Sequence, residues 1–180
     1  DYLNYNVIYQ VNITDVDDKI ILRARQNKLI ELYSLETENM DYEIVKSYAD
    51  IAMKNLRVKQ ETKVAELQKP LPDTAMSRDR AAQEENIKGQ KFKLDQMAEL
   101  EENVLKSERT VPALIAASRE ALAEQLDKER GHSIIDQQIF EDHARKFEQS
   151  FHQDMRALGV REPDVVTRVT EFVPQIVDYI

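Results

Sequence analysis

The sequence predicts a mainly α-helical fold, an antiparallel bundle or set of helical hairpins, with one short strand near the N-terminus. Three observations predict it. The 180 residues include only three glycines and five prolines, and 33% of them are charged, which is typical of long solvent-exposed helices. Apolar residues recur at steps of three and four over most of the chain. A hydrophobic content of 42% is enough for a modest core.

Composition also excludes several classes of protein. The formal net charge of −9 argues against a nonspecific nucleic-acid binder, because phosphate contacts need clustered lysines and arginines. No apolar run approaches the ~18 residues of a membrane span, and no signal-peptide pattern is present. The chain has no cysteine, which excludes disulfides and cysteine-bound metal within it. We therefore expect no membrane partner.

The first predicted element is a strand at Tyr5–Val11. This run is short, rich in β-branched and aromatic residues and without helical periodicity, as in a parallel strand covered on both faces. A lone strand leaves its backbone donors and acceptors unpaired. We therefore expect this one to pair with a second copy of the chain, giving homo-association, or to pack irregularly.

The next element is a helix predicted from Asp15 to Tyr33. Thr14 and Asp17 have the spacing of a capping box, in which a hydroxyl and a carboxylate bind free amides at a helix start. Asp15, Asp17 and Asp18 would also interact favourably with the helix dipole, each contributing ~0.3 to 1 kcal/mol.

The central part of the sequence predicts three further helices. The first runs from Thr37 to Leu67, with Val45, Ala49 and Ala52 on its apolar side, and a turn with two prolines follows at 69–73, where Asp73 or Thr74 would cap the next helix. The second covers 76–109, with its apolar residues Leu94, Met97, Leu100, Val104 and Leu105 in the second half. The third starts at Pro112, buries a stripe of Ile115, Leu122 and Leu126, and ends at Gly131 in a left-handed cap.

The C-terminal part predicts two helices. The first, from Ser133 to Gly159, has the clearest periodicity in the chain: its apolar stripe is Phe140, Ala144, Phe147, Phe151, Met155 and Leu158. We interpret this stripe as core, and a docking face for a partner helix is the alternative. The second helix runs from Glu162 to Ile180, and Pro174 within it should cause a kink.

The sequence offers candidates for two kinds of ligand site, a metal site and a phosphate-binding surface. Asp15, Asp17 and Asp18 form no calcium loop, which would need Gly in place of Ile20 and Glu in place of Gln26. The three histidines (His132, His143 and His152) lack the spacing of a zinc site, so we predict no metal site in this chain. Four basic residues could contact nucleic-acid phosphate, but interspersed glutamates favour an ordinary solvated face: Lys54, Arg57, Lys59 and Lys63.

Two blocks of sequence resemble a known enzyme family. The string NITDVDDKII at Asn12–Ile21 follows the predicted strand, and Phe151–Leu158 and Pro163–Val169 form a second block. Both resemble the cysteinyl-tRNA synthetases of eukaryotic cytosolic type, which are class I enzymes. The resemblance implies that 1–27 is a fragment of a Rossmann-type catalytic domain, with the strand as its remnant. It also implies that 28–138 is a helical insertion and that 139–180 are helices returning to the catalytic or connective region.

The resemblance also implies a function for a longer parent protein in the cytoplasm. That parent would activate cysteine with ATP and transfer it to tRNA(Cys), using magnesium and zinc. Thr14 matches the threonine of the cysteine pocket, and Asn12 and Asp15 match its neighbours at the carboxyl edge of the sheet. The His-Ile-Gly-His and Lys-Met-Ser-Lys-Ser signatures and zinc-binding cysteines are absent, so we assign no catalytic residue here and expect this chain to be inactive alone. A noncatalytic helical scaffold or adaptor is the alternative.

Overall fold

The computed structural model describes residues 5–69, 77–106 and 109–180, apart from the side chains of 100, 101 and 103–106. The chain divides into two compact units. Unit 1 combines Asp1–Lys28 with Ser133–Ile180, and unit 2 is Leu29–His132. The two ends of the sequence therefore fold together, and the segment between them forms a unit of its own.

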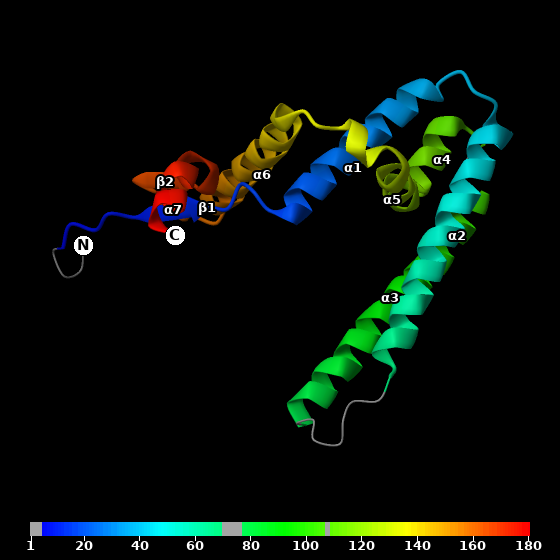
Figure 1. Ribbon diagram of the computed structural model, residues 1–180, viewed down its shortest axis with the longest axis horizontal. Coiled ribbons are helices and arrows are strands. Elements are labelled where there is room, and N and C mark those ends of the chain that lie inside the picture. Colours follow the sequence, from blue (N-terminus) through cyan, green and yellow to red (C-terminus); the bar gives the residue numbers. More distant parts are fainter. Residues whose placement is uncertain (1–4, 70–76, 107–108) are drawn as a thin grey trace. The chain divides into compact units, whose positions relative to one another are not determined.

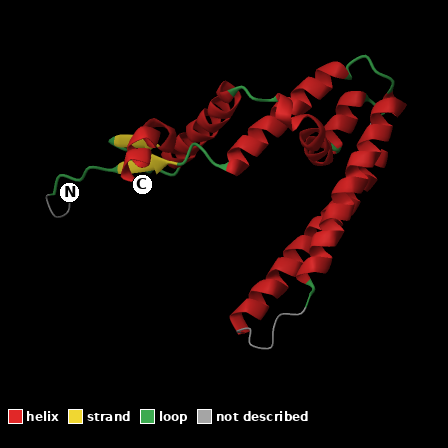
Figure 2. Ribbon diagram, viewed as in Figure 1, coloured by secondary structure: helices red, strands yellow, loops and turns green. Residues whose placement is uncertain are grey.

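Helices dominate the described residues, and the prediction of a mainly α fold is confirmed (Figures 1 and 2). The elements in chain order are β1 (Gln10–Ile13), α1 (Asp18–Glu36), α2 (Tyr42–Leu67), α3 (Ser77–Lys106), α4 (Val111–Ala117), α5 (Arg119–Arg130), η1 (Gly131–Ser133), α6 (Gln137–Ala157), β2 (Val165–Arg168), η2 (Val169–Phe172) and α7 (Val173–Tyr179). The predicted antiparallel packing stays a prediction. None of the described helices is long and apolar enough to cross a membrane.

Unit 2 holds most of the buried apolar side chains. The stripe of α2 predicted from its periodicity is buried at Val45, Ala49 and Ala52, and Asp41 caps the helix by accepting a hydrogen bond from the backbone N–H of Glu43. The helices α4 and α5 contribute the rest of this core, in which Leu114, Leu122 and Leu126 are fully buried. Burial of such side chains is the main stabilising term of this unit.

Two details of the predicted 112–131 helix are wrong. The helix is divided at Ser118, a buried residue whose hydroxyl donates to the carbonyl oxygen of Leu114 at 2.6 Å and so competes with the backbone pattern. Gly131 has right-handed geometry (φ −55°), because the chain continues directly into the 3₁₀ turn η1 and needs no left-handed cap. The predicted stripe is buried all the same.

The helices α2 and α3 pack against each other, and the turn predicted between them lies mostly outside the described residues, as do Asp73 and Thr74. The side chain of Gln83 on α3 donates to the carbonyl oxygens of Leu67 and Lys69, which satisfies the end of α2. Leu94 and Met97 are half-buried as their spacing predicts, while the side chains of Leu100, Val104 and Leu105 lie outside the description.

The strand of unit 1 has a partner within the chain. β1 occupies Gln10–Ile13 and pairs in parallel with β2, with Gln10 opposite Val165 and Ile13 opposite Arg168. The strand predicted at Tyr5–Val11 overlaps the observed one only at Gln10 and Val11. Its partner lies in the same chain, which neither expected alternative, a second copy or irregular packing, included. The helix predicted from Glu162 was also wrong at its start, since Val165, Val166 and Thr167 are β-branched and gain ladder hydrogen bonds from β1.

Three features of the C-terminal half complete unit 1. α6 begins after the cap Asp136 rather than at Ser133. It ends at Ala157, and Gly159, the stop predicted for it, follows with a φ of +77°. Pro174 lies in the first turn of α7, where its missing N–H costs nothing, so it starts a helix and the predicted kink was wrong. The core prediction for the apolar stripe was wrong at Phe147 (60% exposed), Phe151 (39% exposed) and Leu158 (74% exposed), because the two described strands are too narrow to cover it.

Candidate functional site at the carboxyl edge of the parallel strands

Two segments that lie far apart in the sequence meet where β1 and β2 end. The strands are parallel, so the residues after Ile13 and those after Arg168 emerge at the same edge of the sheet. Open parallel sheets bind ligands beyond this carboxyl edge. The edge is therefore the place in unit 1 at which to look for a site.

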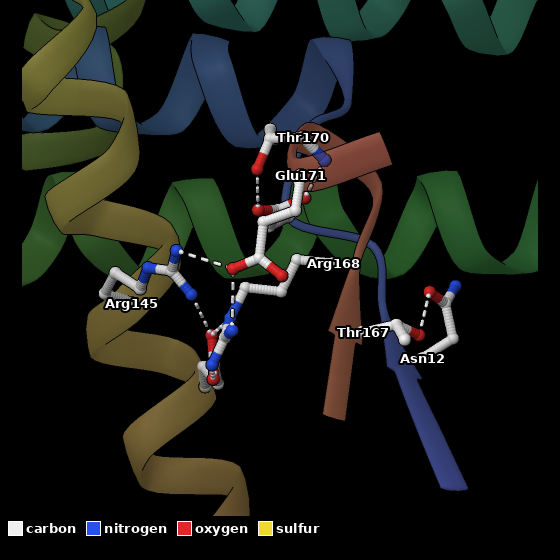
Figure 3. A network of polar contacts seen from close by, with 8 residues as sticks. Asn12, Arg145, Thr167, Arg168, Thr170 and Glu171 are labelled. Carbon is white, nitrogen blue, oxygen red and sulfur yellow. Dashed lines mark hydrogen bonds and ion pairs between the residues drawn. The ribbon is translucent and has the colours of Figure 1, made fainter. Parts of the chain in front are cut away.

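All three residues of the predicted substrate pocket lie at this edge or on the strand leading to it. Asn12 is exposed on β1, and its Oδ1 accepts a hydrogen bond of 3.1 Å from the hydroxyl of Thr167 on β2 (Figure 3). Thr14 is exposed in the connection from β1 to α1. Asp15 is half-buried beside it, and its carboxylate accepts hydrogen bonds from the backbone N–H (3.1 Å) and hydroxyl (2.5 Å) of Thr170.

Thr14 does not cap α1, although its spacing from Asp17 predicted that it would. The helix begins at Asp18, and the Oδ2 of Asp17 accepts from the backbone N–H of Lys19 at 3.1 Å. The Asp17 carbonyl oxygen also accepts the first helical bond, from Ile21. Thr14 lies too far ahead of Asp18 to cap the helix, so that half of the predicted capping box was wrong, and Thr14 lines a groove instead.

The groove has a volume of about 360 Å³ and runs between the edge of β1, the start of α1 and one face of α6. Its apolar lining consists of Ile13, Ile20, Ala144, Phe147 and Phe151, and its polar lining consists of Thr14, Asp15, Lys19, Arg23, His143 and Glu148. An apolar hollow with a few converging polar groups is the usual form of a small-molecule site.

One wall of the groove contains a buried carboxylate, Glu148 of α6, whose residue is 9% exposed. Arg168, the last residue of β2, donates from Nε to both carboxylate oxygens (3.1 and 3.0 Å) and from an Nη to Oε1 at 2.5 Å. Arg145 donates to the other side of the same carboxylate at 3.1 Å. Such charge-assisted, forked contacts compensate the desolvation of the charge and fix the geometry.

Glu171 extends this network to the turn after β2. Its carboxylate accepts a hydrogen bond of 2.8 Å from Arg168 and lies 3.6 Å from Arg145, so two arginines hold two glutamates together (Figure 3). The sequence alone does not single out these four residues. A polar Glu148 next to Phe147 in the apolar stripe of α6, and an arginine ending a β-branched run, are the signals that indicate it.

His143 stands on the same wall, with its ring centroid 4.9 Å from that of Phe147. Burial lowers the pKa of its imidazole below the usual value, and the positive charges of Lys146 and Arg23 lower it further. The neutral ring is therefore favoured in the groove near neutral pH.

The donor atoms in the described part of the chain do not fit a zinc ion. The sequence has no cysteine, and the described residues contain no group of three or more histidines and carboxylates that could hold a metal. Asp15 and Asp17 are engaged with Thr170 and with the start of α1, as described above.

Of the basic residues on α2, Arg57 pairs with Glu61 at 3.1 Å and Lys59 with Glu124 at 2.9 Å.

Comparison with known proteins decides the family. The family described as tRNA synthetases class I (C) catalytic domain matches residues 1–180. This chain belongs to that family. It is 36% identical over 183 residues to the cytoplasmic cysteine–tRNA ligase of Mus musculus, and 34% and 31% identical to those of Drosophila pseudoobscura pseudoobscura and Homo sapiens.

The matches cover all of this chain but only a small part of each relative. Each match includes the whole of this chain but only 20 to 23% of the relative, so the chain spans less than a quarter of the class I synthetases that it resembles. No solved structure matches. Both predicted blocks, at Asn12–Ile21 and at 151–169, thus lie in a class I synthetase catalytic domain, and the structure brings them together as β1 and β2.

Proposed function

We propose that this chain is part of a cysteine–tRNA ligase, the enzyme that activates cysteine with ATP and transfers it to tRNA(Cys). The observation that carries the proposal is the carboxyl edge formed by β1 and β2, where Thr14 and Asp15 line a groove in unit 1 and Asn12 lies on the strand leading to it. The names of the relatives, cysteine–tRNA ligases of the cytoplasm, supply the reaction and a cytoplasmic location.

Within this proposal Thr14 contacts the amino acid. Its hydroxyl is exposed in the groove, where it can donate to or accept from a polar group of a small substrate. Zinc selection of the thiolate, magnesium and the handling of ATP phosphates belong to the rest of the enzyme, because this chain has neither the cysteines nor the signature strings for them. We expect this chain alone to be inactive.

The test is cysteine-dependent ATP–pyrophosphate exchange by the full-length protein that carries this chain, compared with Thr14→Val. We expect exchange with cysteine and not with serine. Losing one hydrogen bond of ~1 kcal/mol predicts that the variant raises the KM for cysteine about five- to tenfold.

A matched control is Thr62→Val on α2, an exposed threonine of unit 2 whose hydroxyl donates to the carbonyl oxygen of Val58. It should leave the KM for cysteine unchanged. Exchange that depends on another amino acid, or on none, would refute the proposed function.

Self-association is a separate part of the proposal. Each of the two described strands pairs on one edge only, and a free strand edge can pair with another chain. Sedimentation of this chain at several concentrations measures it, and a monomer at every concentration would rule it out.

A further inference from the structure

We infer that Asp15 and Thr170 form a latch that positions Thr14, and that the Glu148–Arg168 ion pair anchors the latch. The inference rests on the proposed function, because it assigns a positioning role beside the residue that contacts the amino acid. It adds two groups to the residues predicted for the substrate pocket and the helix cap: the hydroxyl of Thr170 and the carboxylate of Glu148, which lines the groove.

The first step is the geometry of the latch. Asp15 follows β1 and Thr170 follows β2, 155 positions later, and both oxygens of the carboxylate are used, one by the backbone N–H and the other by the hydroxyl. No side chain of the 3₁₀ turn η2 caps its own start, since Arg168 at the cap position makes no such bond. Asp15 supplies that cap from the other segment.

The second step is that the latch restrains Thr14 from one side. Thr14 is bonded covalently to Ile13, which the β1–β2 ladder holds, and to Asp15, which Thr170 holds. The connection from β1 to α1 is thus fixed on both sides of the exposed threonine. A site residue on a connection needs such support, because small displacements of a contacting group are costly to binding.

The third step is the anchor. Thr170 lies two residues after Arg168, whose guanidinium is held by the buried Glu148 of α6. Glu171 on the other side of Thr170 is held by Arg168 and Arg145. The turn that carries Thr170 is therefore fixed to α6 by charged groups on both sides of it.

Kinetics of the full-length protein test the latch with a conservative pair of variants. Thr170→Val removes the hydroxyl and keeps the backbone N–H, whereas Thr170→Ser keeps both donors. We expect T170V to raise the KM for cysteine about three- to tenfold in pyrophosphate exchange, with the KM for ATP changed less than twofold, and T170S to restore the wild-type value.

Hydrogen exchange tests the same latch without activity. The backbone N–H of Thr170 should exchange at least fivefold faster in Asp15→Ala than in the wild type, while amides of α2 keep their rates. If the Thr170 amide exchanges hydrogen at the same rate in D15A and in the wild type, the latch is overturned, regardless of the enzymatic activity.

The outcomes separate the two proposals. The proposed function is refuted if the wild type shows no cysteine-dependent ATP–pyrophosphate exchange. If the backbone N–H of Thr170 still exchanges hydrogen faster in D15A, the latch stays in place. An active wild type with an unchanged KM for cysteine in T170V overturns the positioning role. The positioning role is also overturned if T170V lowers kcat and raises the KM for both cysteine and ATP, and T170S does not restore the wild-type values. That pattern reports a general loss of structure.

Discussion

Glu148 carries a charge that unit 1 keeps almost out of water, and its stability there depends on the arginines beside it. A buried carboxylate left without a partner is costly, because its hydration is lost and not replaced. Arg168 provides a forked contact and Arg145 a single one, so each arginine compensates a different share of that cost. The pairs of the exposed surface, such as Arg156 with Glu162, contribute much less.

Removing Arg168 should therefore destabilise unit 1 more than removing an exposed arginine. We expect Arg168→Met to lower the free energy of unfolding by about 2 to 3 kcal/mol, less than for a fully isolated buried pair because Arg145 remains. Urea-induced unfolding measures the change. The control Arg156→Met removes an exposed pair and should cost less than about 1 kcal/mol.

A double replacement distinguishes charge from packing at the same place. In Glu148→Met with Arg168→Met the uncompensated charge is gone, so most of the stability lost in R168M should return. If the double variant is as unstable as the two single losses added together, the desolvation argument is wrong.

The helices of this chain begin and end where local chemistry places them. Asp17, Asp41 and Asp136 accept hydrogen bonds from backbone N–H groups of the first turn, and Gly159 ends α6 in a left-handed conformation. Such signals act over a few residues, so Gly159 could be predicted from sequence. The helix starts could not be placed as well, because several nearby residues can serve as caps. The predicted starts Thr14 and Ser133 each lie about one turn before the observed caps, Asp17 and Asp136.

Two glycines offer opposite tests of this local control. Gly159 has a φ of +77° and Gly89 lies within α3, and a Cβ would meet nothing within 4 Å at either position. Gly159→Ala should therefore cost about 1 to 2 kcal/mol from backbone strain alone. Gly89→Ala should stabilise by about 0.5 to 1 kcal/mol, because alanine loses less conformational freedom in a helix.

Thermal and urea unfolding of the two glycine variants, measured side by side, check the signs. Shifts of the same sign in both would contradict the assignment of a left-handed residue to one position and a helical residue to the other.

The two units of the chain differ in how they are stabilised. Nearly all of the described residues with buried apolar side chains are in unit 2, and Ala24 and Ala144 are the exceptions. Unit 1 instead relies on a short parallel ladder, the ion pairs of Glu148 and the Asp15–Thr170 bonds, while large apolar side chains such as Phe147 stay exposed. A two-stranded sheet gives little burial, and burial is the dominant favourable term in folding.

Residues 29–132 expressed alone should therefore fold. We expect a helical circular dichroism spectrum and a single cooperative thermal transition, because the core from Leu29 to Leu126 is complete within them. Residues 1–28 mixed with 133–180 should show no such transition. A noncooperative unfolding of 29–132 would show that unit 2 depends on contacts outside itself.

Helical periodicity is a local property, so the sequence alone established the mainly α fold, the buried stripe of α2 and the end of α6 just before Gly159. The resemblance at Asn12–Ile21 likewise predicted the candidate site, since it is carried by adjacent residues. Only the tertiary structure decided that β1 pairs with β2, that Glu148 is buried and that Asp15 binds Thr170. The physical reason is that four-residue strands and single hydrogen bonds gain their free energy from partners about 155 positions away, and no local pattern specifies such a partner.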